Sequence, residues 1–114
     1  MRHTSNLTGF QADPAGLTTI ELLQAYQYEG SVTVLAVVVE QETNTDAEWN
    51  IELAGNDLFA AEQSVAVADT PERFIPDQNQ DAHDDVAVRL ALDLSTPAGN
   101  KDDLNVSVLW DDGR

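Results

Sequence analysis

The sequence predicts an all-β fold, a single antiparallel β-sandwich of the jelly-roll kind, with an immunoglobulin-like sandwich as the alternative. Three observations predict it. Apolar residues recur at every second position in several segments, which is the period of a strand with one buried face. Turn-forming residues separate these segments at short intervals. No segment has a convincing helical period, and 114 residues suit six to eight short strands.

The first part of the chain divides into a polar segment and two apolar ones. Residues 1–17 are polar and contain several turn formers, so we expect an extended N-terminal arm or a loosely packed first strand. The sandwich domain is then expected to span residues 18–114. Residues 18–29 fit a helix or a strand, and the alternation of their apolar residues favours a strand. Residues 31–41 (SVTVLAVVVEQ) are rich in valine and predict a strand.

The middle of the chain predicts one regular strand and two short ones. Residues 47–54 alternate apolar side chains with polar ones, as expected of a strand with one solvated face. Residues 63–68 and 73–75 are shorter apolar stretches that end close to prolines or turn formers. Residues 77–85 (DQNQDAHDD) form a polar loop in this prediction.

The last two strands have the clearest alternation. Apolar residues occupy every second position across residues 85–94 and again across residues 103–110. The intervening residues 95–102 (STPAGNKD) are rich in turn formers and predict a loop.

The strand at residues 31–41 is apolar on both faces, although a strand in a two-layer sandwich has one solvated face. Either its small outer residues tolerate exposure in a central strand, or the arm, a loop or another subunit covers them. Tyrosine is enriched at protein contacts, so nearby tyrosines would belong to the same surface. The expected interface residues are Tyr26, Tyr28, Val37 and Val39.

The net charge excludes several classes of partner. It is −16, from 21 acidic and five basic residues. Binding of nucleic acid or of an anionic membrane surface requires Lys and Arg, so neither is expected. No stretch approaches 18 apolar residues, which argues against membrane insertion. The absence of cysteine excludes disulfides and thiolate chemistry.

The details of the charge point to a salty solvent. Aspartate outnumbers glutamate by thirteen to eight, and Lys101 is the only lysine, although lysine is among the commonest residues of ordinary proteins. Repulsion between carboxylates is nearly screened out at molar salt, where the Debye length falls to about 3 Å. In composition and strand pattern, the chain resembles the structural proteins of haloarchaeal viruses, such as small capsid, penton or decoration proteins.

This resemblance implies a non-enzymatic component of a virus particle, which acts through contacts with copies of itself and with other capsid proteins. The expected location is then the virion. The alternative is a small β-sandwich module of a halophilic host, which binds a ligand or a carbohydrate in the cytoplasm of the archaeon. Both functions remain open from the sequence.

The search for chemistry yields one metal-like motif. Asp77, Asn79 and Asp81 alternate as in the opening of a calcium loop, where carboxylate and amide oxygens bind hard cations. Ala82 and Val88 replace the Gly and Glu that such a loop requires at its sixth and twelfth positions. The segment is therefore either a solvated loop or a site for Ca²⁺, Mg²⁺, Na⁺ or K⁺.

No catalytic or cofactor-binding residues are predicted. The only two histidines, His3 and His83, are far apart in the sequence, which argues against a His-based metal centre. No phosphate-binding glycine loop or nucleophile elbow occurs. Asn6 begins an Asn-Leu-Thr sequon and is a candidate for glycosylation.

The acidic composition predicts that salt stabilises the fold. Thermal melting monitored by circular dichroism should give a higher Tm in about 3 M KCl than in about 0.1 M KCl, because screening weakens the repulsion between carboxylates. Equal Tm values at the two salt concentrations would contradict this explanation of the composition.

Overall fold

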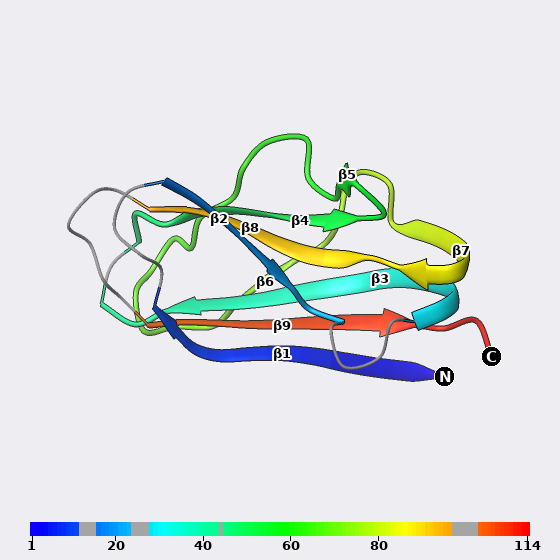
Figure 1. Ribbon diagram of the computed structural model, residues 1–114. Helices are drawn as coiled ribbons and strands as arrows, with labels where there is room; N and C mark the ends of the chain where they lie inside the picture. The colour runs from blue at the N-terminus through cyan, green and yellow to red at the C-terminus, as the bar shows by residue number, and fades with distance from the viewer. Residues whose placement is uncertain (12–15, 24–27, 44, 97–102) are drawn as a thin grey trace.

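The computed structural model describes residues 1–11, 16–23, 28–43, 45–96 and 103–114. Within these ranges the chain is all-β, and nine strands form two antiparallel sheets (Figure 1). The strands are β1 (Arg2–Gln11), β2 (Gly16–Glu21), β3 (Tyr28–Gln41), β4 (Glu48–Leu53), β5 (Asn56–Asp57), β6 (Glu72–Phe74), β7 (Asp81–Val88), β8 (Leu90–Thr96) and β9 (Asp103–Asp111).

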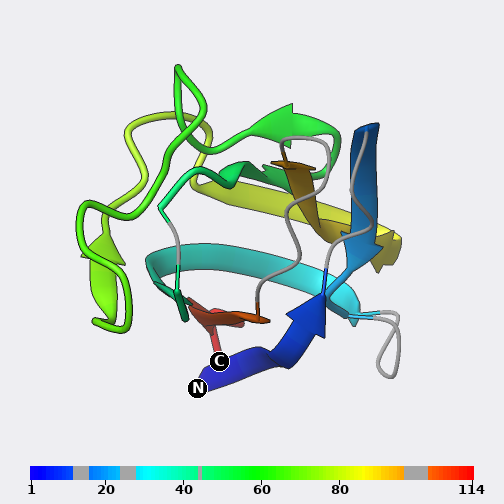
Figure 2. The ribbon, with the colours of Figure 1, turned by 90° about the vertical axis from the view of Figure 1, so that its left-hand side faces the viewer.

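The strand order is that of a jelly roll. One sheet has the order β1-β9-β3-β6, with β7 also paired to β3, and the other has the order β2-β8-β4-β5. The pairs β1 with β9, β2 with β8, β3 with β7 and β4 with β5 are nested, like a long hairpin rolled over on itself. Figure 2 shows the two sheets as separate layers. The predicted jelly-roll sandwich is confirmed.

The core lies between the inner faces of the two sheets. The alternation predicted for the last strands holds, since Leu90, Leu92 and Leu94 of β8 are buried. Trp49 of β4 bridges the layers, because its ring meets that of Phe74, from the five-stranded sheet, edge to face at 4.7 Å. Edge-to-face pairs of this kind add to the stability that burial itself provides.

Of the two alternatives predicted for the N-terminal segment, an extended arm or a first strand, the structure shows a strand that is part of the sandwich. Residues 2–11 form β1, an edge strand that pairs with β9 along most of its length. Its inner positions hold His3, Ser5 and Leu7, so a single aliphatic side chain among them packs against the core. An edge strand needs little apolar surface when its backbone is hydrogen-bonded to a neighbour, which is why polarity alone suggested an arm.

Several predicted elements in the second half of the chain are wrong in extent or are absent from the structure. Residues 63–68 form no strand, and only Gln63 makes an isolated bridge, to Trp49. The predicted loop at residues 77–85 ends early, because β7 begins at Asp81. The single strand predicted at residues 85–94 is divided at Arg89, where the chain passes from one sheet to the other. The inward and outward alternation continues through this crossing, so the sequence pattern hides it.

The sequence also predicts the wrong outward residues for β3, the strand that is apolar on both faces. A bulge in β3 opposite β9, between Val34 and Ala36, shifts the alternation by one residue. Val37 and Val39 are therefore fully buried in the core and do not belong to an outer surface. Leu35 and Val38 face outward instead and are half-buried. Of the two predicted interface tyrosines, Tyr28 begins β3 and Tyr26 lies outside the described residues.

The two ends of the described chain meet at Asp112. Its carboxylate accepts hydrogen bonds from the Met1 ammonium at 2.9 Å and from the Arg114 backbone N–H at 2.9 Å, and lies 2.8 Å from Nε2 of His3. The His3 ring also stacks on Trp110, with the ring centroids 4.3 Å apart. These partners, His3 foremost, hold the pKa of the buried Asp112 carboxyl well below its usual value. The side chain therefore joins β1 to the end of β9.

The Asp112 contacts predict a pH-dependent contribution to stability. Because the pKa of this carboxyl in the folded state lies below the ordinary value of 3.8, the carboxylate stabilises the fold above that pH, and the effect is lost as the pH falls through the folded value. We expect Asp112→Asn to lower the Tm at pH 7, and the difference from the unsubstituted chain to shrink as the solution approaches about pH 2. Asp69→Asn, on an exposed residue, is the matched control. A Tm difference that stays constant with pH would contradict the role of the charge.

Candidate functional site

The outer face of the four-stranded sheet gathers carboxylates from four strands. Backbone register places Glu21, Ala91, Glu52 and Asp57 in one row across β2, β8, β4 and β5. Asp93 lies in the neighbouring row of the same face. Outward positions of adjacent strands are close enough for their side chains to interact directly. These acids are far apart in the sequence, and only the sheet brings them together.

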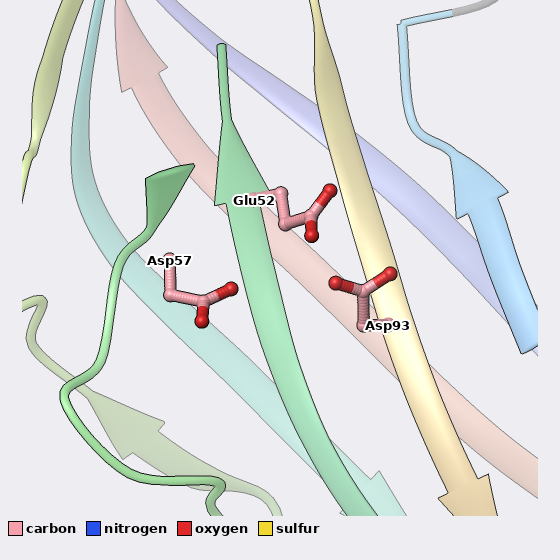
Figure 3. Close-up of side chains that lie close together, drawn as sticks. All are labelled: Glu52, Asp57 and Asp93. Carbon is pink, nitrogen blue, oxygen red and sulfur yellow. The ribbon is translucent and has the colours of Figure 1, made fainter. Parts of the chain in front are cut away.

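Three of these carboxylates form a compact cluster. One oxygen from each of Glu52, Asp57 and Asp93 lies within 4.8 Å of the others. Figure 3 shows the three side chains pointing toward one another from β4, β5 and β8. A hydrogen bond with Asp93, partial burial and the charges of Asp93 and Asp57 all raise the pKa of Glu52. Glu52 therefore keeps its proton to a higher pH than an isolated glutamate does, and the cluster attracts cations when it is fully ionised.

A second carboxyl pair extends the acidic surface. The pKa of Glu62 is raised by a hydrogen bond with Glu48, by desolvation, and by the charges of Glu48, Asp57 and Asp93. Six carboxylates then lie on this face or at its border, and we call this surface the acidic face. Its members are Glu21, Glu48, Glu52, Asp57, Glu62 and Asp93.

Few groups balance these charges. The Arg89 guanidinium Nε donates a hydrogen bond to Glu21. The positive charge of Arg89 also opposes the rise in the pKa of Glu52, although the carboxylates outweigh it. The Thr19 hydroxyl donates to Asp93 at 2.8 Å. Asn50, between the acids, is instead buried and hydrogen-bonded to both backbone groups of Phe59. Asn50 therefore fixes the loop after β5 and takes no part in binding the carboxylates.

The arrangement of the three carboxylates suits a hydrated cation. Hard cations take oxygen ligands, and three carboxylates on an exposed sheet face would leave a bound ion most of its water. Paired carboxylates that hydrolyse glycosides flank a bond held between them, with a set separation across the cleft. The Glu52 cluster instead lies on a strand surface, with its three oxygens converging on one point. The acidic face therefore has the chemistry of a solvated, ion-attracting coat.

The predicted metal-binding residues occupy other positions. The carboxylate of Asp77 accepts a hydrogen bond from the Ala60 backbone N–H at 3.1 Å, and that of Asp81 accepts one from the Thr33 hydroxyl at 2.6 Å. Asn79 has a left-handed backbone, with φ of 39°, in the turn between them. Each aspartate is thus directed toward a different part of the fold. A cation site at these three residues stays a prediction.

The outer face of the five-stranded sheet differs in character from the acidic face. Among the residues whose side chains the structure describes, it carries three carboxylates and two arginines, a net charge of −1 with His83 neutral. We call this surface the neutral face. Its charged residues with described side chains are Arg2, Glu40, Arg73, Asp81 and Asp111. Its centre is apolar, since Leu35, Val38 and Leu109 lie there half-buried.

Hydroxyl and amide side chains surround this apolar centre. The Ser107 hydroxyl donates to Asn6 at 2.7 Å, and Thr33 makes the bond to Asp81 already described. Ser31 lies 2.9 Å from Nδ1 of His83. Asn6, the predicted glycosylation site, is exposed on this face, so a glycan there would cover part of it.

Comparison with models of known protein families and with curated protein sequences finds no match for this chain. The described residues contain no helix long and apolar enough to cross a membrane.

Repulsion within the Glu52 cluster predicts a stabilising substitution. The pKa of Glu52 in the folded state lies above the ordinary value of 4.5, so ionised Glu52 destabilises the fold at neutral pH. We expect Glu52→Gln to raise the free energy of unfolding at pH 7 by about 0.2–1 kcal/mol at low salt, less at molar salt, and not at all at pH 3. Urea unfolding followed by circular dichroism measures this difference.

The matched control is Glu40→Gln, which removes the same charge from the neutral face. Its carboxylate accepts a hydrogen bond from Asn105, so its replacement should not stabilise the protein. Equal stabilisation by both substitutions would show that net charge alone matters and that the cluster has no special effect.

Proposed function

We propose that this protein is a non-enzymatic structural subunit, a component of a virus particle from a halophilic archaeal host, which acts through contacts between subunits. The contrast between the two outer faces is the observation that carries this proposal. Among the described side chains, one face gathers six carboxylates, and the other carries three carboxylates and two arginines around an apolar centre. A subunit in an assembly needs one surface that faces solvent and another that faces its neighbours.

The fold is compatible with this role but does not establish it. Jelly rolls occur in viral capsid proteins, and also in lectins and cupins. Function is therefore argued from the surfaces. A cupin-like enzyme needs a cluster of metal-binding side chains inside the roll. Of the inward positions that the structure describes, those at the centre of both sheets are filled by packed apolar side chains.

The charge supports a particle that remains dispersed in brine. An acidic face that points outward keeps assemblies hydrated and apart in concentrated salt. The same face would repel other copies in dilute buffer, where screening is weak. Assembly through the neutral face would leave this coat intact.

Two measurements test the proposed function. Sedimentation velocity of the 114-residue chain in about 3 M KCl, from about 5 to 500 μM, should show species heavier than the monomer as concentration rises. Mass spectrometry of density-purified particles from a culture that carries the gene should recover this chain in many copies per particle. A chain that is strictly monomeric and absent from particles would overturn the proposal.

A further inference from the structure

We infer that the neutral face is the contact surface for a second copy of this chain, packed face to face about a two-fold axis that lies between the two facing sheets and passes over Leu35 of β3. The inference rests on the proposed function, and it adds the surface, the partner and the symmetry of the contact. Charge, apolar surface and strand register each support it.

Charge selects this face among the two outer sheet faces. Each copy carries a net charge of −16, so a contact between copies is opposed wherever like charges approach one another. At molar salt the Debye length is about 3 Å, so only groups that meet across the contact matter. The acidic face would bring six carboxylates of one copy against six of another. The neutral face carries two of the chain's four arginines, and Asp111 is further paired with the Met1 ammonium.

Apolar surface provides the attraction. Leu109 of β9 lies opposite the bulge of β3, beside Leu35, and Val38 lies opposite Ser107. These three apolar residues form a centre bordered by neutral polar side chains, the arrangement of a protein interface with a dry core and a polar rim. Four strands at a spacing of about 4.8 Å and about eight residues at about 3.3 Å give a face of roughly 500 Å² before its side-chain relief is counted. A standard interface buries about 800 Å² of accessible surface per partner, which is within reach of such a face.

The pairing of β6 and β7 with β3 indicates where the two-fold axis lies. β6 and β7 pair with the same edge of β3, where Arg73 lies opposite Val38 and Asp81 lies opposite Thr33. Leu35 lies between these two positions. A two-fold axis that lies in the plane of the contact, passes over Leu35 and runs perpendicular to the strands exchanges the two ends of the face. Arg73 of each copy then faces Asp81 of the other, and the contact contains this opposite-charge pair twice.

Cross-linking tests the position of the axis. The chain has no cysteine, so Leu35→Cys introduces a single thiol at the centre of the contact. Sheets packed face to face are about 10 Å apart. The Cα atoms of the two cysteines are then too far apart for a direct disulfide, but a short bismaleimide can link the two thiols. We expect Leu35→Cys to give a covalent dimer in about 3 M KCl. Thr19→Cys, exposed on the outer face of the other sheet, is the control and should give none.

Charge exchange tests the pairing. Arg73→Asp and Asp81→Arg should each weaken self-association at least about tenfold, because each places like charges opposite one another in the dimer. The double variant Arg73→Asp with Asp81→Arg should recover most of the lost affinity, because the pairs re-form with reversed signs. Sedimentation equilibrium measures the three dissociation constants, and thermal melts establish that each variant is folded. The matched control for added negative charge is Val67→Asp, since Val67 is 59% exposed and outside the neutral face.

The outcomes separate this inference from the proposed function. If the unsubstituted chain associates but Leu35→Cys does not cross-link, or the double variant is no better than the single ones, the face or the axis is wrong and the structural role stands. If the unsubstituted chain is monomeric at every concentration but is abundant in particles, its partner is another protein and this inference fails alone. If it is monomeric and absent from particles, both fail.

Discussion

The structure depends on one electrostatic constraint, which is that a large excess of carboxylates must stay in water while the sheets between them pack. The jelly roll satisfies this constraint because alternate residues of each strand point to opposite sides of a sheet. Apolar residues of β3, β4, β8 and β9 fill the space between the layers, and acidic residues occupy outward positions and turns. Among the described residues, Asp112 is the one buried carboxylate, and its charge is met by the Met1 ammonium, His3 and a backbone N–H.

The same constraint explains why the two outer faces differ. Carboxylates on adjacent strands repel one another, and the shifted pKa of Glu52 is a consequence of that repulsion. Such a surface costs stability, which concentrated salt restores by screening. On the neutral face the acids have other partners: Asp81 accepts a hydrogen bond from the Thr33 hydroxyl, Glu40 accepts one from Asn105, and Asp111 is paired with the Met1 ammonium. A face with few charges around an apolar centre stands out in a protein of such high charge, and under the proposed function it would direct association to one side of the molecule.

The sequence predicts the sandwich and most of its strands, because strands with one buried face have a period of two. It predicts β4 and β9 well, since Trp49 and Val106 each lie in a clear alternation and both are buried. It leaves β1 open between an arm and a strand, and it misses the start of β7, because edge strands are held by backbone pairing that leaves little trace in side-chain pattern. The crossing at Arg89 and the bulge at Leu35 are also hidden, since the first preserves the alternation and the second changes it by a single residue.

The candidate surfaces, like the edge strands, could be predicted only in part from the sequence. The cluster of Glu52, Asp57 and Asp93 has no sequence motif, because strand order, which the sequence does not reveal, brings its members together. The outward positions of Glu52 and Asp93 in their strands were the available signal. The aspartates at 77 and 81 are close in sequence, yet their carboxylates are bonded to different parts of the fold.

The central claim is that this protein associates through its neutral face and leaves the acidic face in solvent. The most direct measurement is a dilution series followed by two-dimensional NMR of the isotope-labelled chain in concentrated KCl. The account predicts concentration-dependent shifts for Leu35, Val38 and Leu109, and none for Thr19, Glu52 and Asp93. Shifts confined to the second group would place the contact on the acidic face and contradict the account.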